Sequence, residues 1–199
     1  VAFRIPNFFR RLFAEGAFSQ AFLPILAESK ANQSDEEVQL IINHIATKLL
    51  SILMIITLIA IVIAPIIILL FAWGFYFKAD ATQFQLASDM LRITFPYLLL
   101  ISLTALSGSI LNTYDNFIIP AFTPVLLNIS LILSAVFLSK YLTTPIMALA
   151  WGVLFGGIIQ LGFQIPFLRK IKRLPKLQFG HHKALSILRK RMLPALFGV

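Results

Sequence analysis

The stretch that decides the fold runs from residue 49 to residue 77 and reads LLSILMIITLIAIVIAPIIILLFAWGFYF. It contains no charged residue, and a helix of about 20 apolar residues is long enough to cross the hydrocarbon core of a bilayer. Strands of membrane barrels are shorter, at about 10 residues, and alternate between apolar and polar residues. This run therefore predicts a transmembrane helix.

Three further charge-free runs follow, at residues 93–114, 116–139 and 141–168. Of the 199 residues, 59% are hydrophobic and 13% are charged, which excludes an ordinary soluble domain because too few charges remain to cover its surface. The predicted fold class is an all-α membrane protein, a polytopic bundle of transmembrane helices.

The basic residues gather in one loop, which explains most of the formal charge of +9. Residues 169–191 contain nine basic side chains and no acidic one: Arg169, Lys170, Lys172, Arg173, Lys176, Lys183, Arg189, Lys190 and Arg191. Loops rich in lysine and arginine stay in the cytoplasm, so we expect this loop to be cytoplasmic. Because topology explains the charge, no nucleic-acid partner is expected.

Two cytoplasmic segments carry local signals. Ser34 followed by Glu37 fits a capping box, which predicts that a helix starts there. Within the basic loop, Leu185, Leu188 and Met192 recur at helical spacing, as in a short helix lying in the membrane interface. A solvated linker that only sets the topology remains an alternative interpretation of this loop.

The candidate site lies in the first segment, where residues 4–20 read RIPNFFRRLFAEGAFSQ. Its polar members include Arg4, Asn7, Arg10, Arg11, Glu15 and Ser19. All but Arg4 share one half of a helix, and charged groups inside a membrane helix are costly unless they face water, protein or a ligand. Arg11 and Glu15 are four residues apart and able to pair, which leaves Arg10 as the cation least committed to a local partner. Snorkelling of the arginines to the outer surface is the alternative.

Other motifs carry little chemistry. Gly152 and Gly156 form a GxxxG step, which is typical of close helix packing. Cysteine is absent from the sequence, and its three histidines lack the spacing of a metal site. No phosphate-binding loop, nucleophile motif or dinucleotide fingerprint occurs, so no catalytic residue, metal or cofactor is predicted.

Two blocks of sequence resemble a known family. Residues 1–28, VAFRIPNFFRRLFAEGAFSQAFLPILAE, are similar to the second-helix signature of the MurJ/MviN lipid II flippases of the MOP exporter superfamily. Residues 95–132, FPYLLLISLTALSGSILNTYDNFIIPAFTPVLLNISLI, are similar to the fourth and fifth helices of that family.

The resemblance implies a MATE-like bundle of 14 helices in two lobes around a cationic cavity. Residues 1–168 are then expected to form the N-terminal lobe from within helix 2 to helix 6. Residues 169–191 are expected to form a basic amphipathic cytoplasmic connector, and residues 192–199 the start of helix 7. The missing C-terminal lobe of the same protein is then a partner of this chain.

The resemblance also implies a function. The family moves lipid II, a polyprenyl pyrophosphate saccharide, from the inner to the outer leaflet of the bacterial cytoplasmic membrane by alternating access. Arg10 matches the essential helix-2 arginine, with Arg11 and Arg4 as neighbouring cations, while Asn7 and Glu15 are expected to line or gate the cavity. Lipid II and membrane lipids are the expected partners. The alternatives are an exporter of another polyprenyl-linked saccharide, a membrane enzyme acting on a polyprenyl phosphate, and a structural subunit.

Overall fold

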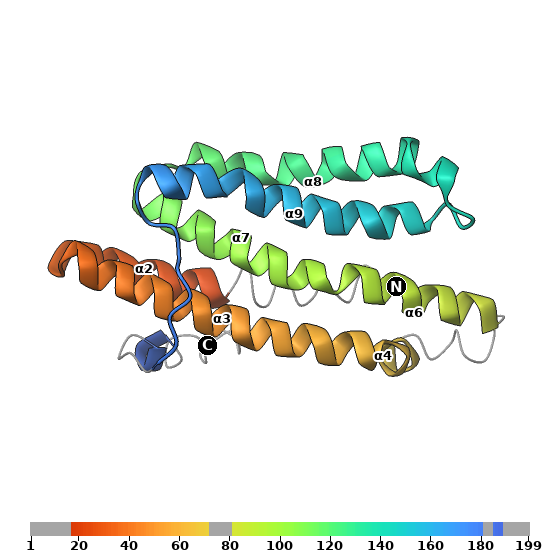
Figure 1. The fold of residues 1–199 in the computed structure, drawn as a ribbon, viewed down its shortest axis with the longest axis horizontal. Coiled ribbons are helices and arrows are strands. Elements are labelled where there is room, and N and C mark those ends of the chain that lie inside the picture. Colours follow the sequence, from red (N-terminus) through yellow and green to blue (C-terminus); the bar gives the residue numbers. More distant parts are fainter. Residues whose placement is uncertain (1–16, 72–80, 181–184, 189–199) are drawn as a thin grey trace.

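The computed structural model describes residues 17–71, 81–180 and 185–188. In these ranges every regular element is a helix (Figure 1), which confirms the predicted all-α fold. The elements in chain order are α2 (Ala17–Asn32), α3 (Asp35–Val62), α4 (Ala64–Phe71), α6 (Ala81–Thr94), α7 (Pro96–Thr113), α8 (Ile118–Val136), the 3-10 turn η2 (Leu138–Tyr141) and α9 (Met147–Lys170).

Four segments are long and apolar enough to cross a membrane: Asp35–Val62, Thr82–Thr113, Ile118–Tyr141 and Met147–Lys170. The second of these joins α6 and α7 into one rod (Figure 1). The helix α7 is central, since it packs against α2 and α3 on one side and against α9 on the other. The helix α8 lies at the periphery and packs mainly on α9.

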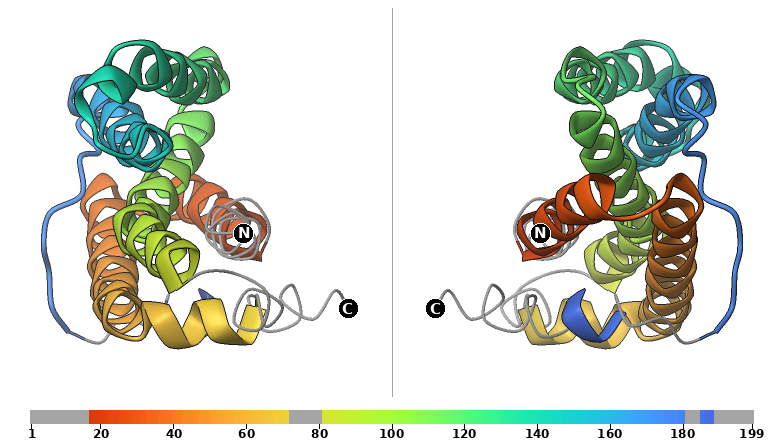
Figure 2. Two further views of the ribbon diagram at one scale, coloured as in Figure 1. Left: turned by 90° about the vertical axis from the view of Figure 1, so that its right-hand side faces the viewer. Right: turned by 90° about the vertical axis from the view of Figure 1, so that its left-hand side faces the viewer.

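The predicted first span is wrong at both ends. The helix α3 already begins at Asp35, where Ser34 and Glu37 form the predicted capping box, with Glu37 N–H donating to Ser34 Oγ at 3.3 Å. It ends at Val62, because Pro65 has no amide hydrogen for the helix ladder and its ring clashes with the preceding turn. The next helix, α4, runs across the long axis of the bundle (Figure 2), so α3 does not continue as a straight rod beyond Val62. Residues 72–77 of the predicted span lie outside the described residues.

The second predicted span also starts too late. Asp89 and Arg92 come just before the predicted span at residues 93–114, but they lie in the second half of α6 and pair at 2.9 Å. Because each charge is balanced one turn away, the helix passes through them without a break. Pro96 marks the boundary with α7, where a missing amide hydrogen is tolerated.

The contact between α8 and α9 depends on small residues, as the GxxxG step predicts. A Cβ atom placed on Gly152 would lie 2.9 Å from Ser134 Cβ, and one on Gly156 would lie 2.6 Å from Leu127 Cδ1. The close approach allows Ser130 Oγ to donate to Gly152 O at 2.7 Å. The predicted role of the two glycines in helix packing is therefore confirmed.

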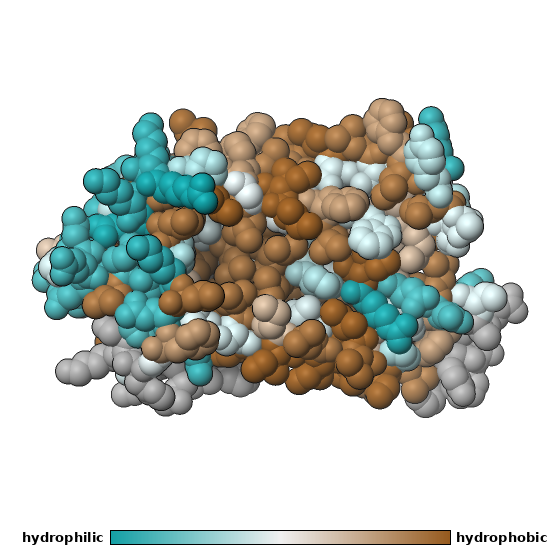
Figure 3. Space-filling view, in the orientation of Figure 1, coloured by the Kyte–Doolittle hydropathy of each residue, from teal (hydrophilic) through white to brown (hydrophobic). Residues whose placement is uncertain are grey.

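Polar side chains gather at one end of the bundle. In Figure 3 they cover the left-hand end, where α3 begins and α9 ends, while hydrophobic residues cover the middle. A smaller polar patch lies over α6, which carries the exposed Gln83, Gln85 and Arg92. The apolar band between polar ends is the surface expected of a membrane-spanning bundle.

Candidate functional site

The predicted site residues Arg4, Asn7, Arg10, Arg11 and Glu15 all precede Ala17 and lie outside the described residues. The described structure begins with the helix that follows them. In α2, Phe22 and Leu26 are fully buried, whereas Leu23 borders a pocket.

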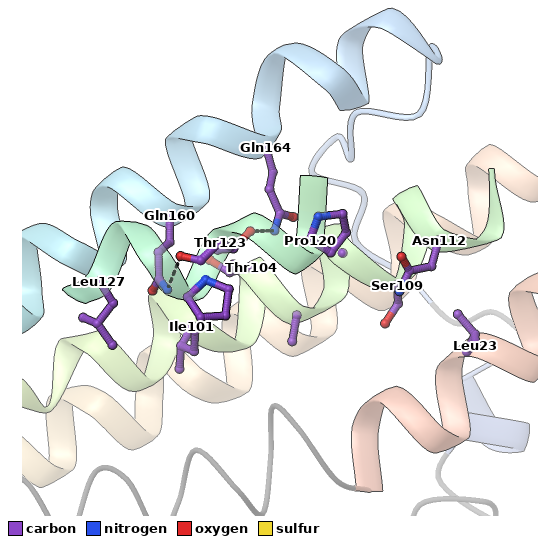
Figure 4. Close-up of a pocket in the computed structure, with 13 residues that line it drawn as sticks. Leu23, Ile101, Thr104, Ser109, Asn112, Pro120, Thr123, Leu127, Gln160 and Gln164 are labelled. Atoms are coloured by element: carbon purple, nitrogen blue, oxygen red, sulfur yellow. Dashed lines mark hydrogen bonds between the residues drawn. The ribbon is translucent and has the colours of Figure 1, made fainter. Parts of the chain in front are cut away.

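This pocket has a volume of about 320 Å³ and lies between α2, α7, α8 and α9 (Figure 4). Its walls combine apolar side chains with small polar and amide groups. The lining residues are Leu23, Ile101, Thr104, Ala105, Gly108, Ser109, Asn112, Pro120, Thr123, Pro124, Leu127, Gln160 and Gln164.

Two glutamines of α9 form the buried polar wall of the pocket. Gln160 is 2% exposed and its Nε2 donates to the carbonyl oxygen of Thr123 at 3.0 Å, while Gln164 is 1% exposed and its Nε2 donates to Thr123 Oγ1, also at 3.0 Å. Both amides reach from α9 to α8 (Figure 4).

The hydrogen bonds determine which way the two amides point. A carbonyl oxygen only accepts, so Gln160 must present its nitrogen to Thr123. The hydroxyl of Thr123 already donates its proton to Ile119 O at 3.0 Å, so Gln164 must donate as well. Both amide oxygens are left without a hydrogen-bond partner among the described residues. Because both residues line the pocket, its wall contains two buried amide groups with unused acceptor capacity.

A second polar group of residues joins four elements at the polar end of the bundle. Lys30 Nζ of α2 donates to Thr113 O at 2.7 Å and lies 4.6 Å from the centre of the Tyr114 ring. The guanidinium of Arg173 lies 5.3 Å from the same ring. Arg173 also forms an ion pair with Asp35 and donates to Asp35 O at 2.8 Å. Tyr114 thus lies in reach of two cations.

Residues 171–180, here called the strap, begin with a turn at residues 171 and 172 and continue beside α3 without forming a helix or strand. Gln39 Nε2 donates to Leu174 O at 3.0 Å, and Lys176 N donates to Asn43 Oδ1 at 2.8 Å. The backbone N–H of Gln178 donates to Thr47 Oγ1 at 2.8 Å. The strap is therefore hydrogen-bonded to α3.

The end of the predicted connector is described only in part. Residues 185–188 are helical, and Leu188 is buried in the core cluster that contains Phe22. Met192, the last member of the predicted apolar stripe, lies outside the described residues.

Sequence reasoning missed both of these polar features. Gln160 and Gln164 are four residues apart in a charge-free span, and buried amides in a membrane helix are a signal that the sequence does carry. Gln39, Asn43 and Thr47 show the same spacing on α3. Among the described residues, no group of three His, Cys, Asp or Glu side chains is placed to hold a metal ion.

Comparison with known proteins gives consistent results. The family profile described as "Lipid II flippase MurJ" matches residues 1–199. The lipid II flippase MurJ of Burkholderia cenocepacia is 42% identical over 204 residues, which cover 100% of this chain and 39% of that protein. A probable lipid II flippase MurJ of Vibrio cholerae is 44% identical over 202 residues, which cover 98% of this chain and 38% of that protein.

A solved structure, a lipid II flippase MurJ in an inward closed conformation, shares the fold. It matches with a TM-score of 0.75 and 30% identity, over 98% of this chain and 39% of the other. The chain thus spans about two fifths of the length of the proteins that it matches. With a family match along its whole length and four helices able to cross a membrane, the chain belongs to the MurJ lipid II flippase family of bacterial membrane proteins.

Proposed function

We propose that the full-length protein moves lipid II from the inner to the outer leaflet of the bacterial cytoplasmic membrane by alternating access. The observation that carries this proposal is the family match over all 199 residues, together with relatives whose names state the same activity. Because the chain spans 39% of the Burkholderia cenocepacia relative, the activity is proposed for the whole protein. Transport rather than an enzymatic reaction is the proposed role.

Arg10 and Arg11 are the proposed binding groups for the pyrophosphate of lipid II. A guanidinium offers a planar fork of donors that matches phosphate oxygens, and its charge persists at every physiological pH. In an otherwise apolar segment, an anionic ligand would offset the cost of the buried cations. Arg4 adds a third cation, and Asn7 and Glu15 are proposed to line or gate the same cavity.

The proposed organisation has three parts. Residues 1–168 form the lobe, residues 169–191 form a cytoplasmic connector, and residues 192–199 begin the next helix. The concentration of lysine and arginine in residues 169–191 supports the cytoplasmic assignment. A cysteine introduced at the exposed Lys176 tests the side, in a full-length protein freed of other cysteines. A membrane-impermeant thiol reagent should label it only after the cells are opened, and labelling in intact cells would contradict the assignment.

Growth complementation tests the role of Arg10. In cells depleted of their own lipid II flippase, the full-length protein should support growth, and Arg10→Ala should abolish that support because the pyrophosphate loses its main charge partner. Arg10→Lys should retain only part of it, since an ammonium lacks the planar fork. The matched control is Arg169→Ala, which removes an exposed arginine in the last turn of α9. Normal growth with Arg10→Ala at equal protein abundance would contradict the assignment.

A further inference from the structure

The two amide oxygens of the pocket lie deep in the membrane. Gln160 is ten residues, or about 15 Å of helix, from the end of α9 at Lys170. At that depth a polar group without a hydrogen-bond partner is costly, because the hydrocarbon offers no donor. An occupant that donates hydrogen bonds would remove this cost.

The polar groups that line the pocket indicate what kind of occupant it suits. Among the described residues that line it, none is charged. Thr104 lines the pocket too, and its hydroxyl already donates to Leu100 O at 2.8 Å, so it offers only acceptor capacity there. A pyrophosphate would bring further acceptors and negative charge to buried acceptors without any cation. Ser109 and Asn112 also line the pocket, and their hydroxyl and amide groups can donate as well as accept. The pocket therefore suits a neutral group that carries hydroxyl or amide groups.

The size and the walls fit a sugar. A volume of about 320 Å³ lies at the lower end of the range of ligand pockets, enough for one or two sugar rings. Leu23, Ile101 and Leu127, which line the pocket (Figure 4), provide apolar surface for the C–H faces of a ring. Hydroxyl and acetamido donors on the ring edge match the acceptors of Gln160 and Gln164.

We propose that this pocket binds part of the neutral saccharide of the carried polyprenyl pyrophosphate. This inference rests on the proposed function and adds to it separate binding groups for the two parts of the head group. The arginines of the first segment hold the charged pyrophosphate, whereas Gln160 and Gln164 accept hydrogen bonds from the uncharged sugar.

Binding of two lipids to the full-length protein in detergent tests the proposal. The first lipid is lipid II, and the second is undecaprenyl pyrophosphate, which has the same tail and charge but no sugar. The double variant Gln160→Met with Gln164→Met should raise the Kd for lipid II about tenfold, the loss expected for two neutral hydrogen bonds. The Kd for undecaprenyl pyrophosphate should change by less than about twofold.

A second variant keeps the glutamines in place. Ala105 lines the pocket, so Ala105→Phe should fill it and weaken lipid II selectively while the bonds to Thr123 persist. Gln83→Met, at an exposed glutamine of α6, is the matched control and should leave both Kd values unchanged. Thermal unfolding of each variant shows whether it remains folded.

The outcomes are distinguishable. If the unchanged protein binds lipid II and both pocket variants bind it equally well, the inference is overturned and the proposed function stands. If the variants weaken the two lipids equally, the sugar is not the occupant, and the inference is overturned as well. If the unchanged protein binds neither lipid, the proposed function fails and the inference fails with it.

Discussion

Two polar stripes cross the apolar bundle: Gln39, Asn43 and Thr47 on α3, and Gln160 and Gln164 on α9. They differ in how completely their amide groups are hydrogen-bonded within the chain. On α3, Asn43 uses both ends of its amide, accepting from Lys176 N and donating to Gln178 Oε1 at 3.2 Å. On α9, Gln160 and Gln164 line the pocket and use only their nitrogens, and their buried oxygens have no partner among the described residues. Both stripes have the same spacing of four residues, so spacing alone does not separate them.

This difference indicates that the two stripes have different roles. An amide that is fully bonded within the chain stabilises a fixed arrangement, here the strap on α3. An amide that is half bonded is available to a ligand. The α3 stripe has one exception, since Gln39 Oε1 also lacks a partner among the described residues, but Gln39 is half-buried near the polar end of the bundle. If this contrast is correct, substitutions in the α3 stripe should lower stability more than substitutions in the α9 stripe.

The largest effect is expected where α8 meets α9. Gly152→Leu would place its Cβ 2.9 Å from Ser134 Cβ and 3.4 Å from Leu131 Cα, so backbone and side chain must both move. We expect a loss of about 2–3 kcal/mol in unfolding free energy, measured by denaturant unfolding in detergent. Gly162→Leu is the control, because a Cβ there would meet nothing within 4 Å. Equal losses at the two positions would show that close packing does not hold α8 on α9.

Asn43→Leu should remove the hydrogen bonds between the α3 stripe and the strap. It removes the acceptor of Lys176 N–H and the donor to Gln178, in a side chain that is buried. The expected cost is about 2 kcal/mol, with faster amide hydrogen exchange at residues 174–178. Asn128→Leu, at an exposed asparagine of α8, is the control and should change neither quantity. Unchanged exchange in the strap would contradict its attachment through Asn43.

Tyr114 should contribute less, through its ring. Tyr114→Leu removes the aromatic face beside Lys30 and Arg173 and should cost about 1 kcal/mol. Tyr114→Phe keeps the ring and should cost almost nothing, because the hydroxyl has no partner among the described residues. Thermal unfolding of both variants measures the difference. A larger loss with phenylalanine than with leucine would contradict a role of the ring.

Gln164→Met should have the smallest effect on stability. It removes a hydrogen bond to Thr123 but also removes a buried oxygen without a partner, and the two changes nearly cancel. The unfolding free energy should change by less than about 0.5 kcal/mol. A loss as large as that of Asn43→Leu would mean that both stripes are structural, and the contrast between them would disappear.

The features that the sequence predicted correctly are local. The capping box at Ser34, the close packing at Gly152 and Gly156 and the existence of four spans each depend on a few neighbouring residues. The ends of the first two spans were mispredicted. Charge was taken as the boundary of a span, but Asp89 and Arg92 neutralise each other within α6. The charge-free run at residues 49–77 predicts one span, but it contains Pro65, and α3 ends at Val62.

The features that the sequence did not predict require distant residues to meet. The strap pairs residues 174–178 with α3, more than 130 positions earlier in the chain. The pocket needs four helices, and the state of its two glutamines depends on the hydroxyl of Thr123, which is committed to its own helix. The candidate site at Arg10 remains a prediction from the sequence and from the family.

Translocation of lipid II by the full-length protein in proteoliposomes is the most direct test of the central claim. A fluorescent lipid II in the starting leaflet should become accessible from the other side with the unchanged protein and with Arg169→Ala. Arg10→Ala should reduce the rate to that of protein-free vesicles, at equal amounts of folded protein. Translocation by Arg10→Ala at the unchanged rate would contradict the role of Arg10, and no translocation by the unchanged protein would contradict the proposed function itself.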